Sequence, residues 1–203
     1  LQAMNIRVRL NDISGMVEID GMPPQYSRTN AANVLPVLLM DYIKEHGLKS
    51  TRQNIDDCLV AIMDENRFNP VRDMLEATQY DGRDRITEIR EMLGMGGDDL
   101  ECTFLTKWLH QCVAMALNDE KQPYGADGVL VLQDEQGAGK TLFCATLAVH
   151  PDLFAEGVSI DLNNKDTVIQ STGVWIAEMG ELDSTLKREQ SALKAFLTAA
   201  RDT

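Results

Sequence analysis

The stretch VLVLQDEQGAGKTLFCATL, residues 129–147, restricts what this chain can fold into more than any other segment. An apolar run precedes a glycine-rich turn, and a second apolar segment with helical character follows it. The template G-x-x-x-x-G-K-[ST] fits at Gly139, Lys140 and Thr141, and it fails only at its first position, where Asp134 replaces glycine. We therefore expect a phosphate-binding loop between a buried strand and a helix.

In a loop of this kind, main-chain amides and the start of the following helix bind the phosphates, and glycines let the backbone approach closely. The predicted binding segment consists of Gln136, Gly137, Ala138, Gly139, Lys140, Thr141 and Leu142.

Within that segment, Lys140 is expected to place its charge on the β- and γ-phosphates of ATP, and the Thr141 hydroxyl is expected to bind Mg²⁺. The first template position lies where the strand ends, so we expect the Asp134 carboxylate to face away from the nucleotide. The alternative is that G-A-G-K-T begins a buried helix by chance.

A second stretch, TGVWIAEMGELDSTLKREQSALKAFL at residues 172–197, predicts a buried strand that ends at Glu178. An acid at the carboxyl end of such a strand can hold Mg²⁺ or a water bound to it, which makes Glu178 a candidate metal ligand and catalytic residue. Glu181 is the candidate for orienting the attacking water. The alternative for Glu181 and Asp183 is that they are acids at a helix start, and for Asp183 we prefer it.

The rest of the chain is predicted to be mainly helical. Alternating apolar residues around Ser14 and Gly15 indicate a β-hairpin over residues 6–20. Apolar residues at helical spacing then predict helices at residues 31–42, 55–63, 70–77, 85–93 and 105–116.

From residue 128 the pattern changes to continuous apolar runs, at residues 128–132, 158–160 and 173–177, which are typical of a parallel sheet covered on both faces. Three strands are fewer than the roughly 5 to 6 of an average sheet. We therefore predict an α/β chain with a boundary near residues 123–127. Residues 1–125 form a mainly helical leader with an N-terminal hairpin, and residues 126–203 form the N-terminal part of a P-loop core.

Composition limits the function classes. The chain has 32 acidic and 19 basic residues, a net charge of -13, which argues against a broad nucleic-acid footprint on this segment. Its four cysteines are scattered without a C-x-x-C pair, which favours a reducing cytoplasm over a disulfide or zinc framework. The richest apolar run, residues 34–40, is too short to cross a bilayer, so we expect neither export nor a membrane anchor.

Four segments together resemble the virulence-associated protein E family of phage and prophage proteins. They are RFNPVRDMLEATQYDGRDRI (residues 67–86), FLTKWL (104–109), GVLVLQDEQGAGKT (128–141) and the stretch that contains Glu178. The resemblance extends from about Asn54 onward. It implies an ATPase core like that of superfamily 3 helicases and AAA+ proteins, in a DNA primase-helicase that couples hydrolysis of Mg-ATP to DNA translocation.

The same resemblance implies partners: single-stranded DNA in the full-length protein, further copies of the chain in a ring, and a primase domain or other replication proteins. Family members commonly carry glycine where this chain has Asp134. The family also continues past residue 203 with a sensor strand and trans-acting arginines, so we expect this chain to be a fragment. Two alternatives stay open: a non-catalytic ATP-binding assembly module, and a small-molecule P-loop kinase, which the lack of a lid-like arginine cluster disfavours.

Overall fold

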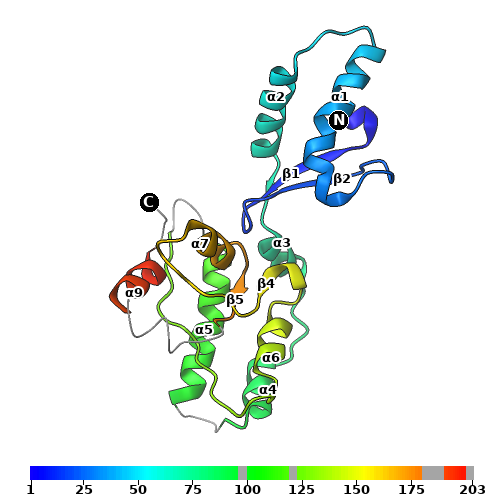
Figure 1. The fold of residues 1–203 in the computed structure, drawn as a ribbon. Coiled ribbons are helices and arrows are strands. Elements are labelled where there is room, and N and C mark those ends of the chain that lie inside the picture. The colour runs from blue at the N-terminus through cyan, green and yellow to red at the C-terminus, as the bar shows by residue number, and fades with distance from the viewer. Residues whose placement is uncertain (96–99, 119–122, 180–189, 200–203) are drawn as a thin grey trace. The chain divides into compact units, whose positions relative to one another are not determined.

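The computed structural model describes residues 1–95, 100–118, 123–179 and 190–199. The chain divides into two compact units, residues 1–70 and 71–203 (Figure 1). Each unit combines helices with a small sheet, so the chain is a mixed α/β protein, as the sequence predicts. The boundary predicted at residues 125–126 falls inside the second unit and stays a prediction.

The first unit is a three-stranded sheet with two helices, and its β-hairpin confirms the one predicted. Strand β1 (Arg7–Asn11) pairs with β2 (Val17–Asp20) in antiparallel register, and it pairs on its other edge with β3 (Arg67–Phe68) in parallel. The other elements of this unit are η1 (Gln2–Met4), η2 (Arg28–Asn30), α1 (Ala31–Glu45) and α2 (Arg52–Glu65). Strand β1 is therefore central, in the order β2-β1-β3.

Local signals explain why the two helices of this unit begin and end where they do. The Thr51 hydroxyl accepts a hydrogen bond from the Asn54 amide at 3.2 Å and caps α2. Gly47 follows α1 with φ of 70°, a conformation that favours glycine, and the Leu48 amide then donates to the Ile43 carbonyl at 3.0 Å.

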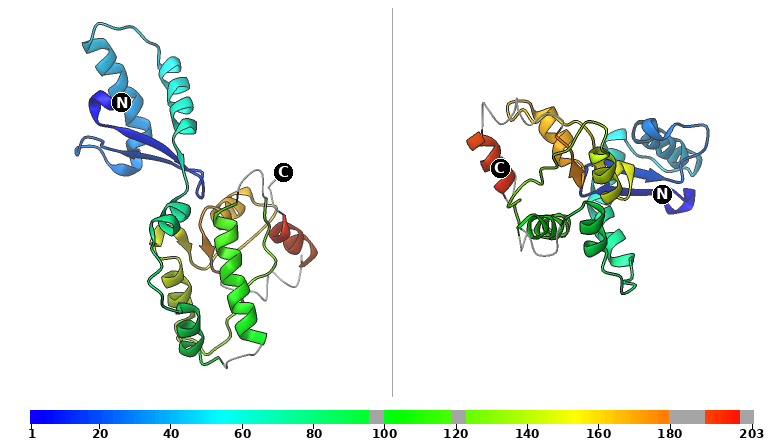
Figure 2. Two further views of the ribbon diagram at one scale, coloured as in Figure 1. Left: turned by 180° about the vertical axis from the view of Figure 1, so that it is seen from behind. Right: turned by 90° about the horizontal axis from the view of Figure 1, so that it is seen from below.

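The core of the first unit lies between the sheet and the helices (Figure 2). It consists of Ile6, directly before β1, Val8 of β1, Leu35 of α1, and Ile55 and Leu59 of α2. Partly buried apolar side chains surround this cluster, and all of them belong to residues 1–70. The unit thus has a hydrophobic core of its own.

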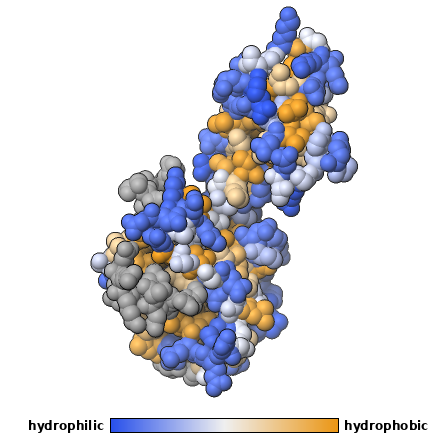
Figure 3. All heavy atoms as spheres, viewed as in Figure 1, coloured by the Kyte–Doolittle hydropathy of each residue, from blue (hydrophilic) through white to orange (hydrophobic). Residues whose placement is uncertain are grey.

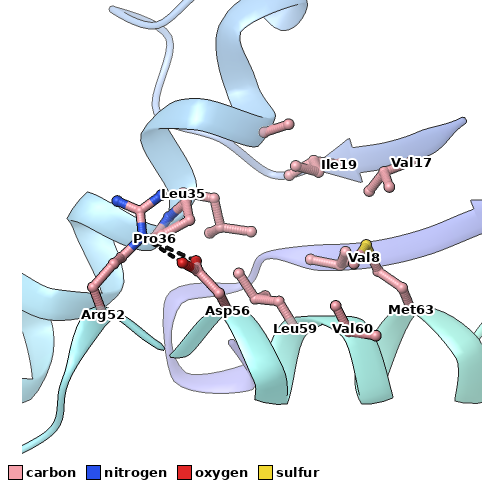
Figure 4. A pocket seen from close by; sticks show the side chains of 11 residues that line it. Val8, Val17, Ile19, Leu35, Pro36, Arg52, Asp56, Leu59, Val60 and Met63 are labelled. Atoms are coloured by element: carbon pink, nitrogen blue, oxygen red, sulfur yellow. Dashed lines mark hydrogen bonds and ion pairs between the residues drawn. The ribbon is translucent and has the colours of Figure 1, made fainter. Parts of the chain in front are cut away.

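An apolar groove of about 300 Å³ opens between α1, α2 and the hairpin (Figure 4). Val8 and Ile19 line it from the sheet, and Leu59 lines it from α2. Arg52 and Asp56 also line it, and the Arg52 Nε donates to both carboxylate oxygens of Asp56 at 2.9 and 3.0 Å. The groove is therefore apolar apart from this ion pair.

The second unit is built from short helices around one longer helix. In chain order the helices within its described residues are α3 (Pro70–Ala77, which begins at the last residue of the first unit), α4 (Arg85–Met92), α5 (Leu100–Ala116), α6 (Lys140–Leu147), η3 (Pro151–Leu153), α7 (Lys165–Thr172) and α9 (Gln190–Thr198). Strands β4 (Phe154–Ala155) and β5 (Ile176–Ala177) pair in parallel, with α7 between them in the sequence. The predicted helices are confirmed.

The predicted strands of this unit are confirmed only in part. The strand at residues 173–177 is present as β5, while the neighbouring strand forms at residues 154–155 and not at 158–160. The strand predicted at residues 128–132 is wrong, because that segment has no strand structure and its Val129 and Val131 are 43% and 62% exposed. A buried strand needs partners on its edges, and the described residues of this unit pair only β4 with β5.

Apolar side chains reach the surface in both units (Figure 3). Val60 of α2 is 61% exposed, and Leu142 of α6 is 71% exposed. Within the part of the chain that the structure describes, every helix is too short or too polar to cross a bilayer.

Candidate functional site

The turn before α6 has the backbone that its glycines allow. Gly137 and Gly139 have φ of 86° and 87°, in the left-handed region that glycine adopts without steric cost. The Ala138 amide donates to the Glu135 carbonyl at 3.3 Å, which closes the turn. Helix α6 begins directly after Gly139, so the predicted order of turn and helix is confirmed for this segment.

The first amide N–H groups of α6 take no part in the hydrogen bonds of the helix itself. The first intrahelical bond runs from the Phe143 amide to the Gly139 carbonyl at 2.9 Å, so the N–H groups of Lys140, Thr141 and Leu142 precede the helical ladder. Residues 136–138 in the turn are exposed. An anion that approaches the start of α6 would therefore meet main-chain donors and the positive end of the helix dipole.

The ammonium group of Lys140 folds back over its own loop. Its Nζ donates to the Asp134 carbonyl at 2.9 Å and to the Glu135 carbonyl at 2.8 Å. Both acceptors belong to the segment that leads into the turn. The positive charge is thus held at the loop, although a phosphate would have to compete with these carbonyls for it.

The Asp134 carboxylate binds the main chain of the next residue. Its Oδ1 accepts a hydrogen bond from the Glu135 amide at 2.7 Å, and its side chain is exposed. Among the described residues, Asn5 and Val149 are the non-glycine residues with positive φ, so Asp134 does not have the left-handed backbone that would call for glycine.

Thr141 and Glu178 meet across the second unit. The Thr141 hydroxyl donates to Glu178 Oε1 at 2.8 Å, although 37 residues separate the two in sequence. Main-chain bonds hold Glu178 on both sides: its amide donates to the Ala155 carbonyl at 2.8 Å, and its carbonyl accepts from the Val158 amide at 2.8 Å. The acid therefore sits at the carboxyl end of β5, directly beside the start of α6.

The second oxygen of this carboxylate indicates what the pair can bind. Glu178 Oε2 is buried, and it has no hydrogen-bond partner within the described residues. A buried, unpaired carboxylate oxygen is costly unless a cation or a donor satisfies it. The Thr141 hydroxyl donates its only proton to Oε1, which leaves its oxygen lone pairs available. Hydroxyl and carboxylate oxygens are ligands that Mg²⁺ accepts, so the pair fits this ion.

Two cysteines of this unit have raised thiol pKa values, and one of them, Cys144, lies near the acid. Burial, followed by the negative charge of Glu178, raises the pKa of the Cys144 thiol above its usual range. Burial also raises the pKa of Cys112, to about 12. Both thiols are thus protonated at neutral pH and poor metal ligands. In the described ranges no three His, Cys, Asp or Glu residues form a metal-binding group.

Two residues that hold this site were not singled out from the sequence as site residues. Gln111 of α5 binds the main chain at residues 127–128, and the Trp175 indole donates to the Cys112 carbonyl at 2.9 Å. A glutamine within the apolar pattern of α5 was the available signal for Gln111. The remaining predicted site residue, Glu181, lies outside the described residues.

The sequence of residues 75–203, well over half of the chain, matches the family of virulence-associated protein E-like domains. The chain belongs to the virulence-associated protein E-like family. The match covers the loop at residues 134–142 and Glu178, and it starts later in the chain than the resemblance expected from about residue 54. No match to a curated protein was found.

Proposed function

We propose that this chain is the ATP-binding module of a phage- or prophage-type DNA primase-helicase and that it couples hydrolysis of Mg-ATP to DNA translocation in an oligomer. The observation that carries the nucleotide part is the Thr141–Glu178 hydrogen bond beside the turn and the start of α6, with Glu178 Oε2 unpaired among the residues that the structure describes. The DNA and ring parts rest on the family resemblance.

In this proposal the main-chain amides from Gln136 to Leu142 bind the phosphates, and Lys140 leaves the carbonyls of residues 134 and 135 to reach the β- and γ-phosphates. Thr141 and Glu178 hold Mg²⁺, which when bound offsets the negative charge of the phosphates. Glu181 orients the attacking water. Because the acid is positioned by β5 and the hydroxyl by α6, little rearrangement is needed when the metal binds.

A P-loop ATPase core would also require a strand before the loop. Residues 128–132 carry the apolar run for such a strand but do not form one in the structure.

One observation favours a second candidate, a non-catalytic module in which nucleotide only organises subunits. The charge of Lys140 is engaged by two loop carbonyls, so a nucleotide bound by the main-chain amides alone would leave this charge away from its γ-phosphate. Such a module would bind ATP without turning it over.

The test is ATP turnover by the purified protein with and without single-stranded DNA. We expect turnover that DNA stimulates and that Lys140→Ala or Glu178→Gln lowers by roughly a hundredfold or more. Two matched controls are available in the same unit. Lys165→Ala changes the first residue of α7, as Lys140 is the first of α6, and Glu156→Gln changes the acid that follows β4, as Glu178 follows β5.

Each other outcome points elsewhere. Nucleotide binding without turnover supports the non-catalytic module, and phosphate transfer to a metabolite supports a kinase. A protein that binds no ATP contradicts the assignment of the loop.

A further inference from the structure

The C-terminal half of α5 contacts the segment that leads into the loop. Gln111 is only 8% exposed, and its Oε1 accepts hydrogen bonds from the amides of Asp127 and Gly128 at 2.7 and 3.1 Å. Its Nε2 donates to the Gly128 carbonyl at 2.9 Å. The buried side-chain amide therefore binds two consecutive residues much as a neighbouring strand would, at the point where the segment toward Lys140 begins.

The next residue of α5 contacts the segment that carries Glu178. The Trp175 Nε1 donates to the Cys112 carbonyl at 2.9 Å, and the Trp175 amide donates to the Leu153 carbonyl at 3.1 Å. Glu178 follows three residues later. Figure 1 shows α5 beside β5, the strand between Trp175 and Glu178.

We propose that residues 111 and 112 of α5 act as a brace that holds the two halves of the site in register, with Gln111 and Trp175 as positioning residues for metal-bound nucleotide. Neither side chain is required to touch the ligand. This inference rests on the proposed function, because it explains how Thr141 and Glu178 are kept side by side to bind the metal.

The two contacts act at different distances from the site. The Trp175 bond has the more direct effect on the position of Glu178, because β5 and its main-chain bonds connect the two residues. The Gln111 bonds act on residues 127–128, and residues 129–136, most of which are exposed, separate these from the turn. Loss of the indole bond should therefore affect the metal-dependent part of binding, whereas loss of Gln111 should affect binding with and without metal.

The main experiment compares Trp175→Phe, which removes the donor and keeps an aromatic ring, with Trp108→Phe. Trp108 lies on α5, the helix that carries Cys112, so the control makes the same chemical change at an indole that does not bind the Cys112 carbonyl. We measure ATP affinity with and without Mg²⁺. We expect Trp175→Phe to weaken Mg-ATP binding by roughly threefold to tenfold, the effect of one lost hydrogen bond, with little change without Mg²⁺.

A second variant tests the Gln111 contact. Gln111→Met keeps the length of the side chain and leaves two main-chain amides without their acceptor. We expect weaker ATP binding both with and without Mg²⁺. The matched control is Gln53→Met, at a glutamine of α2 whose amide binds Asp57 within the same helix.

A readout without nucleotide separates this inference from the proposed function. The amides of Val158 and Glu178 are bonded to the Glu178 and Ala155 carbonyls, and their hydrogen exchange reports whether the acid stays in place. We expect faster exchange at both amides in Trp175→Phe and unchanged exchange in Trp108→Phe. If the unmodified protein binds no ATP, the proposed function fails, and this exchange result still decides whether the brace exists. The brace is overturned if Trp175→Phe and Trp108→Phe show the same hydrogen exchange at these two amides and the same affinity for Mg-ATP.

Discussion

At the scale of single residues, the carboxylate of Asp134 has two opposing effects on an approaching phosphate. It accepts a hydrogen bond from the Glu135 amide at 2.7 Å, which stabilises the start of the turn. It also places a negative charge in the loop. Because the side chain is exposed, solvent screens that charge, and the repulsion is on the order of 1 kcal/mol. The charge and the hydrogen bond can therefore be separated by substitution.

Asp134→Asn keeps an oxygen that can accept the Glu135 amide and removes the charge. We expect it to tighten ATP binding by roughly twofold to fivefold at low salt, with a smaller gain at high salt because ions screen the repulsion. Binding titrations at two ionic strengths measure this. Weaker binding by Asp134→Asn would mean that the charge itself supports the site.

Glu178 should also be detectable through its neighbour Cys144. Burial and then the charge of Glu178 raise the pKa of that thiol, so Glu178→Gln should lower the pKa and increase the thiolate fraction at a given pH. The rate of alkylation of Cys144 as a function of pH measures it, in a Cys58→Ser background because Cys58 is exposed. A Cys144 profile that does not move in Glu178→Gln would show that the acid lies too far away to act on it.

At the scale of elements, the turn before α6 depends on the backbone of Gly139. A Cβ added there would meet no atom of the described residues within 4 Å, so its cost is the strain of φ at 87° in a residue other than glycine. We expect Gly139→Ala to lower the free energy of unfolding by about 1–2 kcal/mol. Gly128→Ala is the matched control, because a Cβ there is equally unhindered and φ is not in the left-handed region. Denaturant unfolding compares the two, and equal stability of both variants would argue against the strain.

The elements also show which parts of the fold can be predicted from the sequence. Helices α1, α2 and α5 were predicted because a 3.6-residue apolar pattern is local, and the cap at Thr51 and the stop at Gly47 are local as well. Strands depend on partners that the pattern does not contain. The run at residues 128–132 therefore predicted a strand that is absent, and the two-residue strand β3 was not predicted at all.

The candidate site divides in the same way. The spacing of the glycine turn, Lys140 and Thr141 is a local motif, and the acid after an apolar run pointed to Glu178. The contacts of Gln111 and Trp175 join residues 16 to 63 positions apart, and no local pattern reports such pairs. The two-residue strand β4, which positions Glu178, is also too short to give a periodic signal.

At the scale of the whole molecule, the first unit should respond to core mutations without involving the second. Leu35 is 1% exposed in a cluster made only of residues 1–70. Leu35→Ala should lower the free energy of unfolding of this unit by about 2–5 kcal/mol. Amide exchange should become faster in α1 and α2 and stay unchanged in α5 and α6. Val37→Ala, at a 49% exposed position of the same helix, is the control, and faster exchange throughout the chain would contradict separate cores.

The central claim is that Thr141 and Glu178 together bind the metal of a metal-nucleotide complex, and ATP affinity measured across a Mg²⁺ titration tests it most directly. The unmodified protein should bind ATP more tightly as Mg²⁺ rises. Thr141→Val, which keeps the shape of the side chain without the hydroxyl, and Glu178→Gln should each lose roughly tenfold or more of the Mg-dependent affinity and keep the affinity measured without Mg²⁺. ATP binding that ignores Mg²⁺, or that neither substitution changes, would contradict the account.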